Sequence, residues 1–223
     1  MLTESEKRFE AYCALRSYPC MPIKLEERTG RRPDYRVTTP GGDVICEVKQ
    51  IEMGPWELQK EEELHASGRA DYSRAIGEKV HNLIRRAAPQ LRPYASEGIP
   101  CIIAALDLTP HLYLSENDID GGMFGVPVFR YHLAESEGER GRAEVGHGGE
   151  RQITEKERKY VSALAVMDCR NENLVYYHNP FASHPLIPHY FPHPTDIHMV
   201  KDGHPDKSGH SWFRYVGSLE KPT

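Results

Sequence analysis

Asp34, Glu47 and Lys49 are three charged residues whose spacing predicts a shared pocket. Asp34 precedes a Pro-Gly-Gly connection (40–42), and Glu47 and Lys49 follow it two residues apart. Two carboxylates beside an ammonium group are costly to remove from water unless a further charged partner is bound. A divalent cation with a phosphate group is such a partner, because hard cations prefer oxygen ligands. The residue types therefore predict a metal site that acts on a phosphate.

Two strands of a hairpin must position these residues. Alternate side chains of a strand share a face. In the segment 44–51, Val44, Cys46 and Val48 form an apolar face, and Glu47 and Lys49 project from the other face. The segment 34–38 alternates in the same way, so we expect the two segments to pair. A second acid-x-Lys, at 157–159, lies in a charged run without apolar alternation, and we expect no site there.

The chain resembles the PD-(D/E)XK nuclease superfamily through Pro33-Asp34 and Glu47-Val48-Lys49. The resemblance implies that Asp34 and Glu47 bind one or two Mg²⁺ (or Mn²⁺) ions together with the main-chain carbonyl of Val48. It implies that Lys49 orients the attacking water or helps to deprotonate it. The implied reaction is hydrolysis of phosphodiester bonds.

Glu10 is the fourth acid that the resemblance brings to the site. It lies in a helix predicted over 3–17, where the superfamily pattern favours an acid. The implied role is to hold a second metal ion or a bridging water. The alternative is that Glu10 is solvated, while Glu47 and Lys49 form an exposed ion pair on an edge strand worth about 0–1 kcal/mol.

A longer helix is predicted over 71–94, because apolar residues recur there at helical spacing. This helix has a basic side made of Lys79, Arg85, Arg86 and Arg92, and Gln90 is a further polar candidate. The sharper interpretation is that these residues contact nucleic-acid phosphates beside the metal site. The alternative is an ordinary solvated face.

The order of elements predicts an α/β fold. A continuous apolar run at 101–106 is typical of a buried central strand, and it follows two strands and a helix. The resemblance implies a restriction-endonuclease-like mixed β-sheet core flanked by helices. We expect one domain with its core at 3–107 and 160–186, a loop-rich insertion at 108–159 and a Pro/His-rich extended tail at 187–223.

The histidines concentrate toward the end of the chain. Of 12 in total, seven fall in the C-terminal third, which leaves a zinc site, an HNH-type nuclease or a metal-binding tail open. An HNH motif needs a helix after its hairpin, and five prolines within 180–194 oppose one. The alternative is an extended segment that wraps the domain. The aromatic residues expected to anchor it are Phe181, Tyr190, Phe191 and Trp212.

Composition restricts the class of protein. The 223 residues are 39% hydrophobic and 27% charged, as in a soluble globular protein. No apolar run is long enough for a membrane helix, and the first residues do not resemble a secretory signal. We therefore expect a cytoplasmic protein. The formal charge of −5 argues mildly against indiscriminate nucleic-acid binding, and five dispersed cysteines argue against a disulfide framework.

The sequence thus predicts a metal-dependent endonuclease whose partner is nucleic acid, with DNA favoured and RNA left open. A homodimer is compatible with this prediction. One alternative is a catalytically inactive module of the same fold that binds nucleic acid or protein, or takes part in an assembly. Another is that the histidine-rich tail is the active element.

Overall fold

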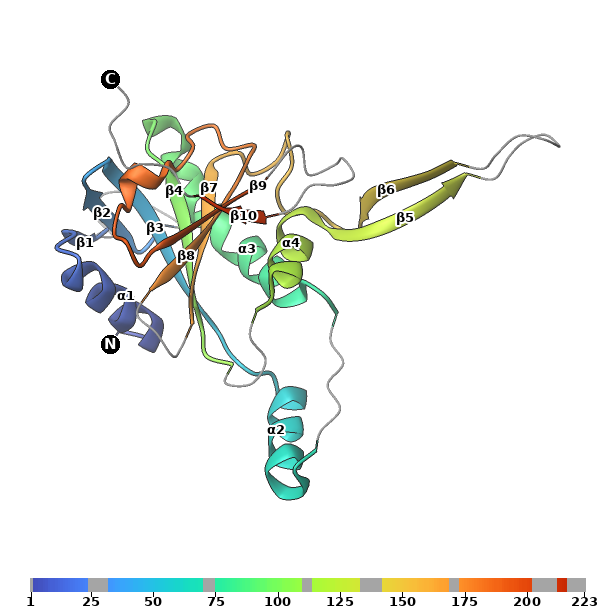
Figure 1. Cartoon of the computed structure of the whole chain (residues 1–223). Helices are drawn as coiled ribbons and strands as arrows, with labels where there is room; N and C mark the ends of the chain where they lie inside the picture. Colours follow the sequence, from blue (N-terminus) through green and yellow to red (C-terminus); the bar gives the residue numbers. More distant parts are fainter. Residues whose placement is uncertain are drawn as a thin grey trace.

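The computed structural model of the chain has helices on both sides of a large β-sheet (Figure 1). It describes residues 2–23, 32–69, 75–109, 114–132, 142–168, 173–201 and 212–215. Some sequence predictions fall outside these ranges. They concern the tail histidines His204 and His210, the first residues of the helix predicted at 71–94, and part of the insertion predicted at 108–159.

Ten strands and four α-helices build the described parts of the chain. The helices are α1 (Glu4–Leu15), α2 (Pro55–Ser67), α3 (Glu78–Leu91) and α4 (Glu116–Phe124). The strands are β1 (Cys20–Pro22), β2 (Tyr35–Thr39), β3 (Gly42–Ile51), β4 (Cys101–Asp107), β5 (Val126–His132), β6 (Arg142–Gly148), β7 (Val161–Asp168), β8 (Leu174–His178), β9 (Ile197–Lys201) and β10 (Trp212–Arg214). Short 3₁₀ helices span Arg92–Glu97 and Pro188–Tyr190. Within the described ranges, no helix has both the length and the apolar character needed to cross a bilayer.

Eight of the strands form one sheet in the order β1-β2-β3-β4-β7-β8-β9-β10, while β5 and β6 pair separately. The first three strands are antiparallel, and β3, β4 and β7 are parallel. The sheet is therefore mixed, with helices flanking it. This confirms the α/β class that the sequence predicts.

The predicted site lies on the β2–β3 hairpin, and the geometry of its turn requires glycine at positions 41 and 42. Tyr35 pairs with Cys46 across the hairpin. Gly42 has φ +122°, a conformation that side chains other than glycine rarely adopt. A Cβ atom at Gly41 would lie 2.8 Å from the Cα atom of Tyr190. The turn is thus tight and also packed against the C-terminal segment.

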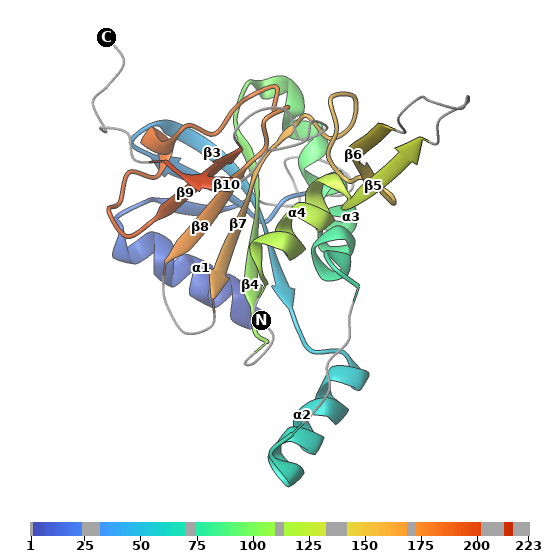
Figure 2. The same ribbon diagram turned by 45° about the vertical axis from the view of Figure 1, so that its right-hand side comes forward.

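Helix α1 covers one face of the sheet, and α3 and α4 cover the other (Figure 2). Each face has its own hydrophobic core. Even-numbered residues of β3, such as Cys46, pack in the cluster that contains α1. Odd-numbered residues, such as Ile45, pack in the cluster that contains α3 and α4. Because side chains alternate along a strand, Glu47 and Lys49 belong to the α3 face. The predicted alternation of this strand is correct.

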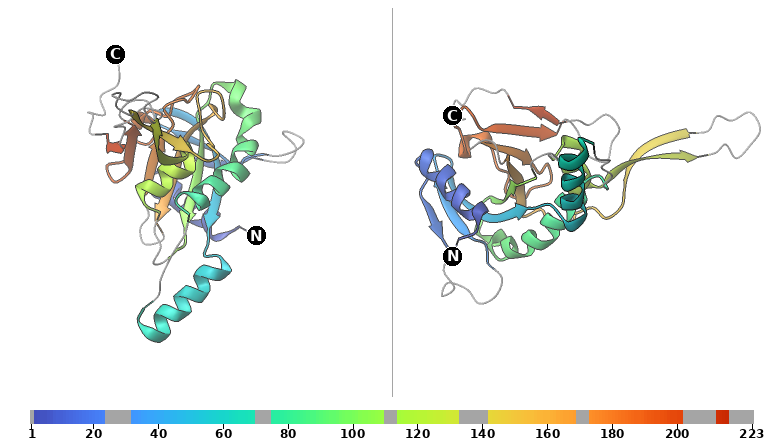
Figure 3. Two further views of the ribbon diagram at one scale, coloured as in Figure 1. Left: turned by 90° about the vertical axis from the view of Figure 1, so that its right-hand side faces the viewer. Right: turned by 90° about the horizontal axis from the view of Figure 1, so that it is seen from below.

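Two elements project from the body of the molecule. The β5–β6 hairpin extends away from the sheet, and α2 extends beyond the end of β3 (Figures 1 and 3). The loop-rich insertion predicted at 108–159 therefore contains regular structure in its described part. Its helix α4 begins with a capping box, in which Ser115 and Asp118 bind each other's main-chain amides.

The C-terminal segment predicted as an extended tail at 187–223 contributes two strands, β9 and β10, to the main sheet. Phe191 is buried and stacks on Tyr176 with ring centroids 4.8 Å apart. Trp212 contacts Tyr177 edge-on at 5.2 Å. Aromatic anchoring by Phe191 and Trp212 is therefore correct, but the segment completes the sheet as well as wrapping it.

His178 at the end of β8 and His198 on β9 form a buried pair. His178 Nε2 and His198 Nδ1 are 2.9 Å apart, and His198 Nε2 is 3.0 Å from the carbonyl of Phe191. These contacts suit two neutral rings, with His198 donating to Phe191 and accepting from His178. Burial, reinforced by the neighbouring His198, lowers the pKa of His178 to about 3. Burial also lowers the pKa of His198.

The histidine pair predicts a pH-dependent contribution to stability. A lowered pKa in the folded state means that protonation favours unfolding as pH falls below the ordinary value near 6.5. We expect His178→Gln to reduce the loss of unfolding free energy between pH 7 and pH 5 by about 2 kcal/mol. Urea unfolding of the variant and wild type at both pH values measures this difference. His65→Gln on α2, where the ring is exposed, should leave it unchanged; an equal effect would contradict the assignment.

Candidate active site

The β2–β3 hairpin brings Asp34 to the side of β3. The amide of Asp34 donates to the carbonyl of Cys46 at 3.1 Å, just before β2 begins. In return, the amide of Val48 donates to Asp34 Oδ2 at 2.7 Å. The N–H and C=O of a strand residue point toward the same neighbour, so the Val48 carbonyl is directed to the Asp34 side of β3 as well.

Glu47 lies at the centre of this arrangement. It is fully buried, at 0% exposure. Its Oε1 atom forms an ion pair with Lys49 and accepts a hydrogen bond from the side-chain amide of Gln90 on α3. Its Oε2 atom is buried and has no hydrogen-bond partner among the residues that the structure describes. A buried carboxylate oxygen without a partner is unfavourable, so a proton or a cation bound at Glu47 Oε2 would be stabilised.

Burial disfavours the ionisation of both carboxyl groups. Burial, followed by the charge of Asp34, raises the pKa of Glu47 to about 8, while Lys49 opposes the shift. Burial also raises the pKa of Asp34, against the effects of the Val48 amide and of Lys49. Two acids in one buried site cannot both ionise cheaply. The pair therefore requires either a bound proton or a bound cation near neutral pH.

Glu10, the predicted fourth member, has a different partner in this structure. The hydroxyl of Tyr35 donates to Glu10 Oε1 at 2.9 Å, and Tyr35 packs against Phe9 on the α1 side of the sheet. The α1 carboxylate that contributes to the raised pKa of Asp34 is that of Glu6. The structure thus brings together Asp34, Glu47 and Lys49 without Glu10, whose metal role stays a prediction.

The site contains donors that fit a hard cation, although few of them are carboxylates. Within the described ranges, no cluster of three or more His, Cys, Asp or Glu residues is able to hold a metal ion. Mg²⁺ commonly uses one or two carboxylates and completes its shell with waters and substrate phosphates. The free oxygen of Glu47, the carboxylate of Asp34 and the carbonyl of Val48 satisfy this smaller requirement.

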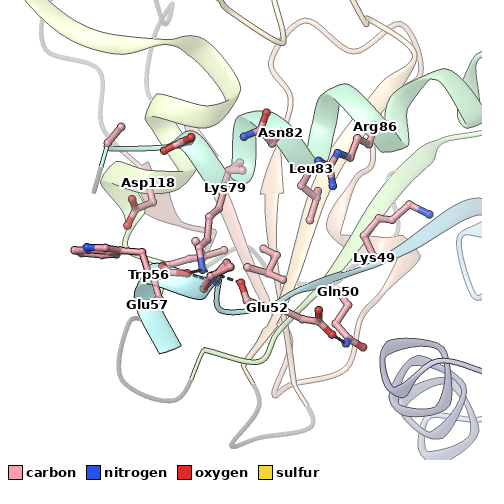
Figure 4. Close-up of a pocket in the computed structure, with 17 residues that line it drawn as sticks. Lys49, Gln50, Glu52, Trp56, Glu57, Lys79, Asn82, Leu83, Arg86 and Asp118 are labelled. Atoms are coloured by element: carbon pink, nitrogen blue, oxygen red, sulfur yellow. Dashed lines mark hydrogen bonds and ion pairs between the residues drawn. The ribbon is translucent and has the colours of Figure 1, made fainter. Parts of the chain in front are cut away.

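A cleft of about 680 Å³ adjoins Lys49 between the end of β3, the start of α2 and α3 (Figure 4). We refer to it as the α2–α3 cleft. Lys49 and Arg86 lie at one end of it, and Trp56 lies toward the other. The residues lining the cleft that enter the argument below are Lys49, Glu52, Trp56, Glu57, Lys79, Arg86 and Asp118.

The basic residues that the sequence predicts on the α3 helix do not form one surface. Arg86 lines the α2–α3 cleft. Lys79 forms an ion pair with Glu57 at 2.6 Å and is thereby held in the wall of the cleft. Arg85 donates to Asn82 at 3.0 Å and lines a separate hollow. Helical spacing places these residues on one helix, but it does not reveal the partners that other elements supply.

Two features of the site were not predicted. Gln90 was expected at a phosphate, whereas the structure uses it to bind Glu47. Trp56 was not singled out, because its position in the cleft depends on how α2 begins after β3. No family model, curated protein or solved structure matches the chain.

Proposed function

We propose that the protein is a metal-dependent nuclease of the PD-(D/E)XK type that hydrolyses phosphodiester bonds of nucleic acid, with DNA as the favoured substrate. The observation that carries the proposal is the buried pair Asp34 and Glu47 with an unpartnered carboxylate oxygen and Lys49 alongside. Near neutral pH such a pair needs a bound proton or a bound cation. The helix, antiparallel β1–β3, helix α3 and parallel β4 also support a restriction-endonuclease-like core.

Each residue of the site has a role in this proposal. A bound Mg²⁺ would lower the pKa of water and stabilise charge on phosphorus oxygens. Asp34, Glu47 and the Val48 carbonyl would hold it. Lys49 would orient the attacking water and offset the growing negative charge, as the water oxygen bonds to phosphorus and the ester bond breaks. Gln90 keeps the Glu47 carboxylate in place.

Cleavage assays test the proposal directly. Purified protein is incubated with single-stranded DNA, duplex DNA and RNA, with Mg²⁺, with Mn²⁺ or with chelator. We expect metal-dependent cleavage that Lys49→Ala lowers by about 10²- to 10⁴-fold, the range for a group that assists proton transfer. Activity that survives chelation, or that Lys49→Ala leaves unchanged, would contradict the mechanism.

Metal binding should also be visible as stabilisation. A ligand at 100 times its dissociation constant stabilises the folded state by about 2.7 kcal/mol, or roughly 5–10 °C in melting temperature for a chain of this length. We expect this rise with Mg²⁺ or Mn²⁺ in wild type and its loss in Asp34→Asn. Asp43→Asn changes an exposed acid of β3 and should keep the rise. An equal rise in both variants would place the metal elsewhere.

The measurement of stabilisation by metal also distinguishes the nuclease from a second candidate function, a nuclease-fold module without catalysis. The small number of acids in the site favours this candidate, since the described residues offer no third carboxylate to a metal. A module of this kind would bind nucleic acid without metal uptake and without cleavage. Predicted dimerisation and cytoplasmic location stay predictions in either case.

A further inference from the structure

We propose that the α2–α3 cleft binds a single-stranded segment of nucleic acid and that one of its bases stacks on the indole of Trp56. The inference rests on the proposed function, because Lys49 belongs both to the carboxylate site and to the cleft. A phosphate at Asp34 and Glu47 would place the neighbouring nucleotides at the opening of this cleft. The substrate class of the enzyme would then be single-stranded nucleic acid or a strand with unpaired ends.

The indole is positioned by contacts that the start of α2 makes with α3. Glu57 Oε2 accepts a hydrogen bond from the amide of Gly54 at 2.7 Å, which fixes the first turn of the helix. The same oxygen pairs with Lys79 of α3 at 2.6 Å, and Lys79 also donates to the carbonyl of Glu52 at 2.9 Å. Trp56 lies in this turn, with 41% of its surface exposed. A large aromatic ring thus lines the cleft with part of its surface exposed.

Charge divides the cleft into two ends. Lys49 and Arg86 supply positive charge at the end beside the carboxylate site (Figure 4). The cleft is also lined by four acids, Glu52, Glu57, Glu78 and Asp118. Glu57 and Asp118 are engaged in holding helices in place, and Glu52 accepts a hydrogen bond from the side chain of Gln50. The first end therefore favours a phosphate. The second end lacks a surplus of positive charge and favours a neutral group.

A nucleobase is the neutral group that fits the second end. Every base has a flat π-face that stacks on an aromatic side chain, and the contact needs no compensating charge. The bases inside a duplex already have both faces covered by their neighbours. An indole stacks only on a base that has left the duplex or belongs to a single strand. The charge pattern and Trp56 together favour a single strand over a duplex.

Equilibrium binding without metal tests the inference independently of cleavage. A fluorescein-labelled oligo(dT) single strand and a labelled duplex of the same length are titrated with protein in chelator, using fluorescence anisotropy. We expect Trp56→Ala to weaken single-strand binding about tenfold or more, since stacking on one base accounts for at least that ratio. Trp56→Phe should stay within about threefold of wild type. Arg86→Ala should weaken the binding of both ligands, because it removes the proposed contact between Arg86 and phosphate.

A matched variant controls for effects on the helix itself. Leu58 is exposed on α2 and does not line the cleft, so Leu58→Ala should bind as wild type does. A second readout avoids changing Trp56. The chain has two tryptophans, and Trp212 packs against other rings. In Trp212→Phe the emission reports Trp56 alone, and we expect oligo(dT) to quench it.

The outcomes separate this inference from the proposed function. The stacking site is overturned if wild type fails to bind oligo(dT), if Trp56→Ala binds it normally, or if Trp56→Ala weakens single strand and duplex equally. It is also overturned if the emission of Trp56 does not change on binding. Cleavage by wild type in Mg²⁺ would then still support the nuclease. Binding that depends on Trp56 without any cleavage would keep the stacking site and contradict hydrolysis.

Discussion

Glu47→Gln is expected to reduce metal-dependent cleavage about a thousandfold or more while leaving the protein folded. The substitution keeps the shape of the side chain and its ability to accept from Gln90, but it removes the charge that would hold a cation. Loss of a single well-placed electrostatic group in a buried site already costs 10²- to 10³-fold. Loss of a metal ligand should cost at least as much.

We also expect Glu47→Gln to be stable, so that a loss of cleavage can be assigned to the active site. In the metal-free protein, ionised Glu47 is disfavoured by burial and by Asp34, which is why its pKa is raised to about 8. An amide is neutral and donates to the Asp34 carboxylate, and Lys49 is 32% exposed and returns to water. We therefore expect a melting temperature in chelator, at pH 8, equal to or above that of wild type. A large fall would mean that lost activity reflects unfolding.

The chain provides its own control for this experiment. Glu157 heads the second acid-x-Lys and is exposed, with 63% of its side chain accessible and an ion pair of 3.7 Å to Arg158. Glu157→Gln changes the same atoms in a solvated position and should cleave at the wild-type rate. Undiminished cleavage by Glu47→Gln would identify a different site or a contaminating enzyme.

The features of the site predicted correctly are those that depend on neighbours in sequence. A Pro-Gly-Gly turn and two alternating segments define a hairpin, and the hairpin alone brings Asp34 beside Glu47. The alternation also places Lys49 on the same face as Glu47. Each of these inferences needs only the period of a strand and a tight turn.

The features that the sequence did not reveal depend on partners far along the chain. The prediction of a helix around Glu10 is correct, yet Tyr35 from a different element binds the Glu10 carboxylate. Lys79 belongs to a basic helix, but Glu57 from α2 engages it. Neither pairing leaves a periodic signal. The sequence did not predict strand β9, because it is short and follows a proline-rich stretch; it pairs with β8 and β10.

The same dependence on distant partners explains why the C-terminal segment is integral to the fold. The hydroxyl of Tyr12 on α1 donates to Asp196 at 2.7 Å and contacts the hydroxyl of Tyr176 at 2.7 Å. Arg16 pairs with Asp196 at 3.3 Å, where both side chains are almost completely buried. Arg16 also donates to Asn173 at 2.9 Å. These contacts connect α1 with β8 and with the approach to β9.

Asp196→Ala is expected to destabilise the protein by about 3–5 kcal/mol, because it leaves the Arg16 guanidinium buried without its counter-charge. Thermal unfolding should show a fall in melting temperature of roughly 6–20 °C. Asp43→Ala removes an aspartate from a partly exposed pair with Arg36 and should cost at most about 1 kcal/mol. Equal effects of the two variants would contradict the buried-charge argument.

The destabilisation expected for Asp196→Ala also affects how the histidine-rich segment can be tested. Deleting the chain from residue 187 onward would remove Asp196, Phe191 and His198 together, and with them the buried partners of α1 and β8. We expect that deletion to unfold the core, so lost activity would say nothing about a histidine-based active site. Single substitutions at the partly exposed His189 and His193 avoid this problem. Cleavage that persists in both variants, at wild-type melting temperature, would exclude these two histidines as the active element.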